Sequence, residues 1–174
     1  MTILFLVAAL LATAGAGSPA HPVGDASHPL AGFDGRWVLD AGRSEFGSAH
    51  SVLRARVDDL ASDGERLRIS SLSVRANGDS TSLDYVYRAD STSENTLSGQ
   101  LVRTTGRHAG KALEFVSVVK FALLELRVNE RWALAAGGDT LVIERSSHSP
   151  LGTQHQVLYF AHRGAASAPQ PQRR

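Results

Sequence analysis

The strongest candidates for metal binding in this sequence are its histidines, because the chain has seven of them and no cysteine. Histidines that share a metal ion usually occur at short spacings such as His-x-His or His-x-x-x-His. The seven histidines are His21, His28, His50, His108, His148, His155 and His162. Neither spacing is present among them, and most of them lie in expected turns or near the chain ends. We therefore expect no metal site, and the lack of cysteine also excludes disulfides and a thiolate nucleophile.

Motifs for covalent or cofactor chemistry are also missing. The chain has no Gly-x-Ser-x-Gly elbow for a nucleophilic serine, no P-loop and no dinucleotide fingerprint, so we expect neither an enzyme nor a cofactor. Its 18 Lys and Arg nearly balance 17 Asp and Glu, and a net charge of +1 creates no field that would steer the protein to nucleic acid or to an anionic membrane. Neither is an expected partner.

Glu130 is the residue most able to do acid–base chemistry. It shares the parity of Val128, Trp132 and Leu134 in an alternating apolar stretch, so it is expected to face the protein interior. A buried carboxylate either finds a hydrogen-bond donor or an opposite charge, or stays protonated to a higher pH. Two interpretations follow: an internal pair with Arg, Tyr or Trp, and a ligand contact or general base.

Small polar side chains fall on the same expected inward faces as aromatic ones. The serines are Ser71, Ser73 and Ser117, and the aromatic residues are Tyr85, Tyr87 and Phe115. This mixture is typical of a cavity that binds a small apolar ligand and orients it with a few polar groups. The candidate ligand-binding residues are therefore Ser71, Tyr85, Tyr87, Phe115, Ser117, Glu130 and Trp132. The alternative is a packed core that holds a water or two.

Four arginines form an expected basic stripe on the outside of two neighbouring strands. Leu53, Ala55 and Val57 fit the inward face of the second strand, which turns the intervening arginines outward. The stripe comprises Arg54, Arg56, Arg66 and Arg68, and it is flanked by Asp58, Asp59, Asp63 and Glu65. It is either a solvated face of mutually paired charges or a site for an anion or a partner protein.

The elements that would position all these side chains are β-strands. Apolar residues recur at every second position, and turn residues such as Asn77-Gly78-Asp79 and Gly137-Gly138-Asp139 return about every dozen residues. The pattern predicts about nine short strands joined by tight turns, with a polar break from Ala89 to Thr96. No helical stripe of any length interrupts them.

A meander of this length is expected to curl until its first and last strands meet, because an open sheet would expose two long edges. We therefore predict an all-β protein, an antiparallel up-and-down β-barrel of about eight to ten strands. A sandwich of two sheets has the same strand spacing and is the alternative.

The first expected strand opens with Gly35-Arg36-Trp37, within the stretch FDGRWVLD at residues 33–40 that precedes Ser44-Glu45-Phe46-Gly47. Later, Glu130-Arg131-Trp132-Ala133-Leu134 precedes a Gly-Gly-Asp turn and the stretch TLVIER at 140–145. These features resemble a group of exported bacterial lipocalin-like proteins of unknown function, built on calycin-type β-barrels. The resemblance covers about residues 33–163. It implies that Gly35 permits a sharp start to the barrel and that Trp37 plugs one end. It implies no known activity.

Two lipocalin features differ in this chain. The late Thr-Asp-Tyr signature is missing, and Leu83-Asp84-Tyr85 shares only a dipeptide with it, too early in the chain. The resemblance also implies an arginine on the last strand that covers the tryptophan, for which Arg163 is the nearest candidate. By strict alternation, however, Arg163 shares a face with Val157 and Tyr159 rather than with Leu158 and Phe160.

The N-terminus predicts a secreted or periplasmic location in a bacterium. The apolar run from Ile3 to Leu11 is too short to span a membrane and is followed by Ala14-Gly15-Ala16, typical of signal peptidase cleavage after Ala16, with Ala14 and Ala20 as other positions. We divide the chain into a signal peptide at 1–16, a flexible linker at 17–32, the barrel at 33–163 and a disordered tail at 164–174. No stable membrane insertion is expected after cleavage.

These observations predict an exported single-domain barrel that binds a small, mainly apolar ligand without transforming it. The alternative is an envelope scaffold or interaction protein whose barrel is solid and whose loops and tails contact a partner. An enzyme that uses Glu130 as a base is a third hypothesis. The sequence predicts neither the ligand nor the oligomeric state.

Overall fold

The computed structural model describes residues 30–47, 53–121 and 124–163. The signal peptide predicted at 1–16, the tail predicted at 164–174 and most of the linker predicted at 17–32 lie outside the described residues. At the end of that linker, Leu30 is buried and Ala31–Phe33 forms a short 3-10 helix, η1.

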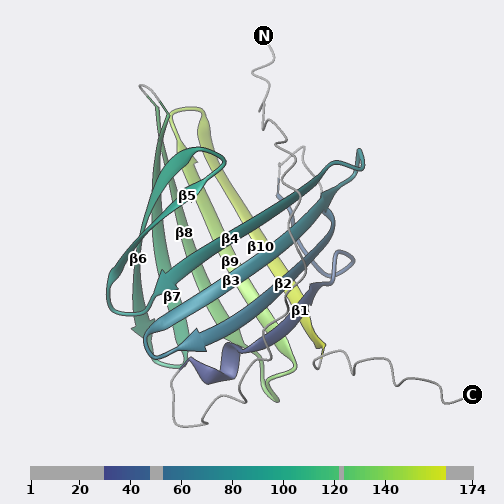
Figure 1. The fold of residues 1–174 in the computed structure, drawn as a ribbon. Helices are drawn as coiled ribbons and strands as arrows, with labels where there is room; N and C mark the ends of the chain where they lie inside the picture. Colours follow the sequence, from purple (N-terminus) through teal and green to yellow (C-terminus); the bar gives the residue numbers. More distant parts are fainter. Residues whose placement is uncertain (1–29, 48–52, 122–123, 164–174) are drawn as a thin grey trace, which may run out of the picture.

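The described chain forms ten β-strands that run up and down in sequence (Figure 1). They are β1 (Gly35–Leu39), β2 (Leu53–Asp63), β3 (Arg66–Arg75), β4 (Ser80–Arg88), β5 (Thr92–Leu97), β6 (Gln100–Ala109), β7 (Ala112–Phe121), β8 (Leu124–Leu134), β9 (Thr140–Ser149) and β10 (Gly152–Arg163). Among the described residues, no helix is long and apolar enough to cross a membrane.

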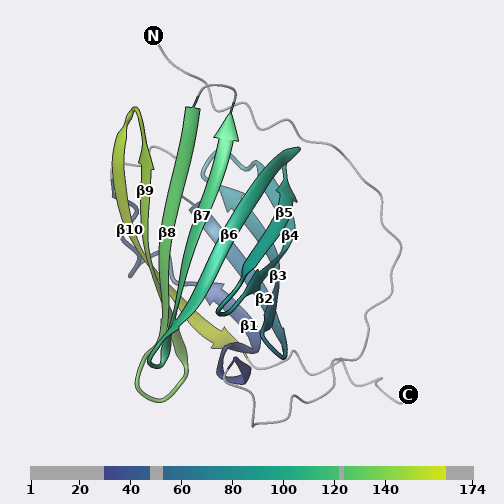
Figure 2. The ribbon, with the colours of Figure 1, turned by 90° about the vertical axis from the view of Figure 1, so that its left-hand side faces the viewer.

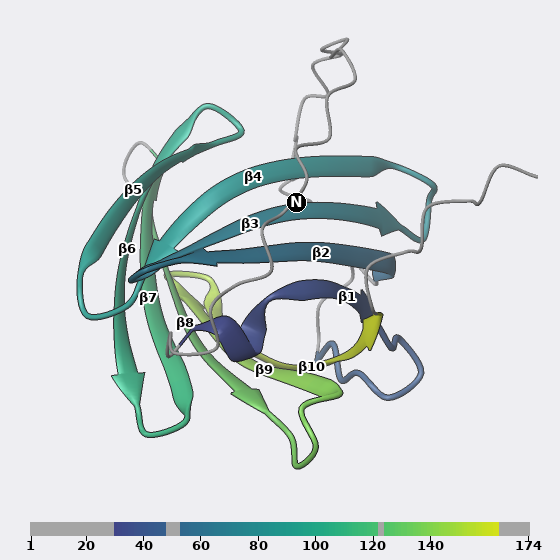
Figure 3. The same cartoon turned by 60° about the horizontal axis from the view of Figure 1, so that its bottom comes forward.

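The strands follow one another round a nearly closed barrel in the order β4-β3-β2-β1-β10-β9-β8-β7-β6-β5. Figure 3, which brings the bottom of the view in Figure 1 forward, shows this ring of strands with η1 at the near end. The first and last strands pair antiparallel, with Arg36 opposite Arg163 and Leu39 opposite Phe160. The predicted antiparallel up-and-down barrel is therefore confirmed, and the two-sheet sandwich is excluded.

The barrel has a seam between β4 and β5, the two ends of the strand order. No backbone ladder joins these two strands, although every residue of both is described. The Asn95 side chain of β5 instead bonds the backbone of β4. Its Oδ1 accepts from the Val86 N–H at 2.8 Å, and its Nδ2 donates to the Val86 carbonyl at 2.9 Å. Figure 2 shows β4 and β5 next to each other on one side of the barrel. The polar break predicted from Ala89 to Thr96 was wrong, because β5 begins inside it at Thr92.

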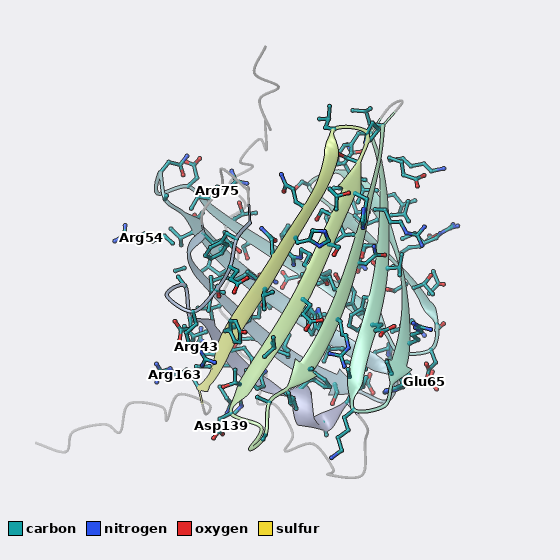
Figure 4. All side chains as sticks on the ribbon, turned by 180° about the vertical axis from the view of Figure 1, so that it is seen from behind. Arg43, Arg54, Glu65, Arg75, Asp139 and Arg163 are labelled. Atoms are coloured by element: carbon teal, nitrogen blue, oxygen red, sulfur yellow. The ribbon has the colours of Figure 1, made fainter. Side chains whose placement is uncertain are left out.

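A β-bulge at the start of β2 reverses the parity predicted for that strand. Its pairing with β3 shifts register between Leu53 and Ala55, and an extra residue in a strand moves every later side chain to the other face. The prediction that Arg56 faces outward was therefore wrong: Arg56 is 6% exposed, while Ala55 is exposed. Arg54 does lie on the outside, pointing away from the barrel in Figure 4.

Apolar side chains fill the end of the barrel that holds η1, which we call the η1 half. Its fully buried residues include Trp37, Leu67, Leu113, Trp132, Leu141, Ile143, Leu158 and Phe160. The indole N–H of Trp37 donates to the Phe33 carbonyl at 2.8 Å, so η1 is tied to the tryptophan that occupies this end. We call the opposite end, where the β3–β4, β5–β6 and β9–β10 turns lie, the far half.

His162, rather than Arg163, contacts the buried Trp37. The two rings meet edge to face with centroids 4.8 Å apart, whereas Arg163 is exposed and points away from the barrel in Figure 4. Gly35 has a φ of +121°, and a Cβ at this position would collide with the His162 ring. Glycine is thus required both by the backbone conformation at the start of β1 and by the close approach of His162.

Candidate ligand-binding cavity

A cavity of about 300 Å³ lies in the far half of the barrel. It is lined by residues from nine strands: Arg56, Ser71, Ser73, Leu83, Tyr85, Tyr87, Leu97, Val102, Ser117, Val119, Val128, Glu130, Arg145, Ser147 and Gln156. The volume is at the lower end of the range for ligand pockets and corresponds to about ten water molecules in the liquid. A barrel of this size can therefore hold a small ligand.

On β3 and β9, the inward positions change from apolar in the η1 half to polar in the far half. On β9, Leu141 and Ile143 are fully buried, while Arg145 and Ser147 line the cavity. The inward side chains of β3 change in the same way, from the apolar Leu67 and Ile69 to serines at positions 71 and 73. Period-two alternation places all of these side chains inside the barrel, and their chemistry decides which end is hollow.

Most of the predicted ligand-binding residues lie on the cavity wall. Those that line it are Ser71, Tyr85, Tyr87, Ser117 and Glu130. Phe115 and Trp132 do not line the cavity: both are fully buried and pack against Tyr87 in an aromatic layer that we call the floor, where their rings meet edge to face with centroids 5.5 Å apart. The Tyr87 ring joins the cavity to this floor, because its centroid lies 4.4 Å from that of Phe115.

The Glu130 carboxylate is held by three groups from the cavity wall and floor. The Arg145 Nε donates to its Oε1 at 2.6 Å, and the Trp132 indole N–H and the Tyr87 hydroxyl donate to its Oε2 at 3.2 and 3.3 Å. Burial by itself would raise the pKa of Glu130, but the charge and hydrogen bond of Arg145 outweigh burial, and its pKa is lowered. The internal pair predicted for Glu130 is confirmed. A carboxylate with a lowered pKa is a weak general base at neutral pH.

A second ion pair lies on β2, inside the barrel. The Arg56 Nε donates to Asp58 Oδ1 at 2.9 Å, and its Nη2 lies 3.4 Å from the Tyr85 hydroxyl. Burial opposes the charge on Arg56, yet the neighbouring Asp58 carboxylate more than offsets it and raises the pKa of the guanidinium. Burial also raises the pKa of the Tyr85 hydroxyl, which is neutral at physiological pH.

Asp58 is the more deeply buried residue of this pair. Its side chain is 0% exposed, and among the described residues its Oδ2 has no hydrogen-bond partner. Two charges from positions i and i+2 can share one face of a strand, so they enter the barrel together as a neutral pair. The single salt bridge to Arg56 is what offsets the burial of Asp58.

Four polar residues of the cavity were missed from the sequence: Arg56, Arg145, Ser147 and Gln156. Arg145 could have been found, because it shares the parity of Leu141 and Ile143 on β9. Arg56 could not, because its inward orientation depends on the bulge in β2. Gln156 lies opposite Arg145 in the β9–β10 ladder, and its amide donates to the Phe46 carbonyl at 3.4 Å.

The outer surface carries the rest of the predicted basic stripe. Arg66 and Arg68 both approach Asp63, with N–O distances of 2.6 and 3.6 Å, as expected of a solvated, mutually paired face. A second hollow, of about 480 Å³, lies on this face at the seam. It is lined by Arg66, Arg68, Val86, Arg88, Thr92, Ser93, Glu94 and Asn95. Within the described ranges, no group of three or more His, Asp or Glu side chains could hold a metal ion.

Solved structures with the same fold are small β-barrels. A variant of the fluorescent protein UnaG superposes with a TM-score of 0.51 and 12% sequence identity, over 78% of this chain and 99% of that chain. Zebrafish ileal bile acid-binding protein in complex with cholic acid gives 0.49 and 11%, over 76% and 99% of the two chains. Human cRBP IV gives 0.49 and 10%, over 75% and 97%. At 12% identity the likeness to the UnaG variant is one of fold alone, and it agrees with the barrel implied by the sequence resemblance.

No protein-family model and no curated protein matches the chain.

Proposed function

We propose that the protein binds a small, mainly apolar ligand in the far half of its barrel and does not transform it. The observation that carries this proposal is the cavity of about 300 Å³, whose wall combines apolar side chains with a few polar groups. The solid barrel assumed by the scaffold alternative does not agree with such a cavity. Catalysis by Glu130 is disfavoured because its carboxylate is engaged by Arg145, Tyr87 and Trp132.

The test is native mass spectrometry of the protein purified from its own host. We expect a bound small molecule under gentle conditions, and its loss in the double variant Ser73→Leu/Ser147→Leu, whose added side chains enter the cavity from β3 and β9. Ser70→Leu is the matched control, because Ser70 lies one residue from the cavity wall on the outer face of β3. A clean ligand-free mass, together with no binding of neutral apolar probes, would contradict the proposal.

We also propose that the protein acts outside the cytoplasm, secreted or in a bacterial periplasm. The support is the run from Ile3 to Leu11 followed by Ala14-Gly15-Ala16. The intact mass of the protein isolated from its host tests this directly. We expect a chain that lacks residues 1–16, and a full-length cytosolic chain would refute the proposed location.

A further inference from the structure

The two ion pairs at the cavity contain equal numbers of positive and negative charges, with Asp58 buried behind Arg56 rather than lining the cavity. Arg56 and Arg145 supply the positive charges, and Asp58 and Glu130 the negative ones. Each arginine is already bonded to a carboxylate, through Nε–O distances of 2.9 and 2.6 Å. Although three of these four charged side chains line the cavity, the two pairs together carry no net charge.

A charged ligand head would disturb this balance. A carboxylate bound to a remaining N–H group of Arg56 or Arg145 would share that arginine with Asp58 or Glu130, which are 0% and 5% exposed. Two carboxylates would then face one arginine inside the barrel, and the extra buried negative charge without a counter-charge is costly. An ammonium group would likewise have to compete with an arginine for its carboxylate.

Uncharged hydrogen-bonding groups remain available on the same wall. Among the described residues, the hydroxyls of Ser71, Ser73 and Ser147 make no hydrogen bond within the protein, whereas the Ser117 hydroxyl is paired with Thr104 at 2.8 Å. These three hydroxyls can donate to or accept from a neutral oxygen. The wall also contains five apolar side chains: Leu83, Leu97, Val102, Val119 and Val128.

We propose that the ligand carries an uncharged polar head, such as a hydroxyl, ester or ketone oxygen, on a short apolar body, and that the cavity rejects the free acid and the amine of the same shape. This inference rests on the proposed function, because it names the ligand class of that cavity. The neutral head meets the serine hydroxyls and leaves both ion pairs intact.

The experiment is isothermal titration of the full-length protein at neutral pH with four probes of one chain length: octanol, methyl octanoate, octanoate and octylamine. We expect octanol and methyl octanoate to bind at least about tenfold more tightly than octanoate and octylamine. Octanoate binding as tight as octanol would overturn the selectivity while leaving the proposed function in place. If none of the four probes bound, the result would count against the proposed function as well.

Two variants test whether charge balance causes the selectivity. Glu130→Gln on β8 leaves Arg145 without a counter-charge, and Asp58→Asn on β2 does the same to Arg56. Either variant should improve octanoate binding at least about tenfold relative to octanol binding. Two independent positions keep the test valid if one variant fails to fold. Glu114→Gln is the control, because Glu114 pairs with Arg107 on the outer face and should leave the ratio unchanged. An unchanged ratio in both cavity variants would overturn the proposal.

Discussion

The η1 half and the far half of this barrel are built from the same ten strands, yet they differ in what their inward side chains do. In the η1 half, large apolar side chains such as Trp37, Ile143 and Phe160 are fully buried and fill the barrel. In the far half, the inward positions carry serines and two ion pairs around a cavity of about 300 Å³. The comparison teaches that one half supplies stability through packing, while the other is held open by groups that resist collapse into an apolar core.

The largest expected effect is the loss of packing in the η1 half. Trp37→Ala removes a fully buried indole and its hydrogen bond to Phe33, so we expect the free energy of unfolding to fall by about 3–5 kcal/mol. Urea denaturation measures it. Phe121→Ala, at a side chain that is 42% exposed, is the control and should change stability little. Equal effects of the two substitutions would contradict the description of the η1 half as the packed half.

The next effect concerns the ion pair that borders the cavity. Glu130→Gln should lower the free energy of unfolding by about 2–3 kcal/mol, less than full removal of a buried partner costs, because the amide keeps part of the hydrogen bonding and Arg145 is partly exposed. The same denaturation experiment at neutral pH measures it. A variant as stable as the wild type would show that the pair contributes no net stability.

The same pair predicts a dependence of stability on pH. Since the pKa of Glu130 is lowered in the folded protein, its contribution is complete above its unfolded pKa of about 4.3 and is lost as the pH falls through the lower folded value. The stability difference between wild type and Glu130→Gln should therefore shrink below about pH 4. A difference that stays constant down to the acid transition would contradict this assignment.

A pair of substitutions on β3 compares the two halves directly. Ile69→Phe adds volume to the packed half at a residue that is 2% exposed, and overpacking there should cost about 1–3 kcal/mol. Ser73→Leu, four residues further on the same face, adds volume where the cavity can receive it and should change stability by less than about 0.5 kcal/mol. Thermal denaturation of both variants measures this difference. A larger loss of stability in Ser73→Leu than in Ile69→Phe would contradict it.

The smallest expected effect is at the seam. Asn95→Ala removes both hydrogen bonds to the Val86 backbone, and because the seam is only partly buried we expect a cost of about 1 kcal/mol. Amide hydrogen exchange should become faster at Val86 while the ladder between β1 and β10 stays protected. Unchanged exchange at Val86 would mean that the Asn95 side chain does not hold β4 and β5 together.

The sequence by itself determined the strands, their alternation and the burial of particular side chains. Period two is a local property, so the inward orientation of Trp37, Tyr85, Ser117 and Glu130 could be predicted from neighbours on the same strand. The pairing of Glu130 could be predicted as well, because a buried carboxylate needs a partner.

Only the tertiary structure decided where the sheet is interrupted and which end of it is hollow. The bulge in β2 depends on the register with β3, and it sends Arg56 and Asp58 inward together, although each alone would be too costly to bury. The seam depends on Asn95 meeting Val86 across two strands that share no ladder. Both result from contacts between different strands, and such contacts leave no pattern within any one strand's sequence.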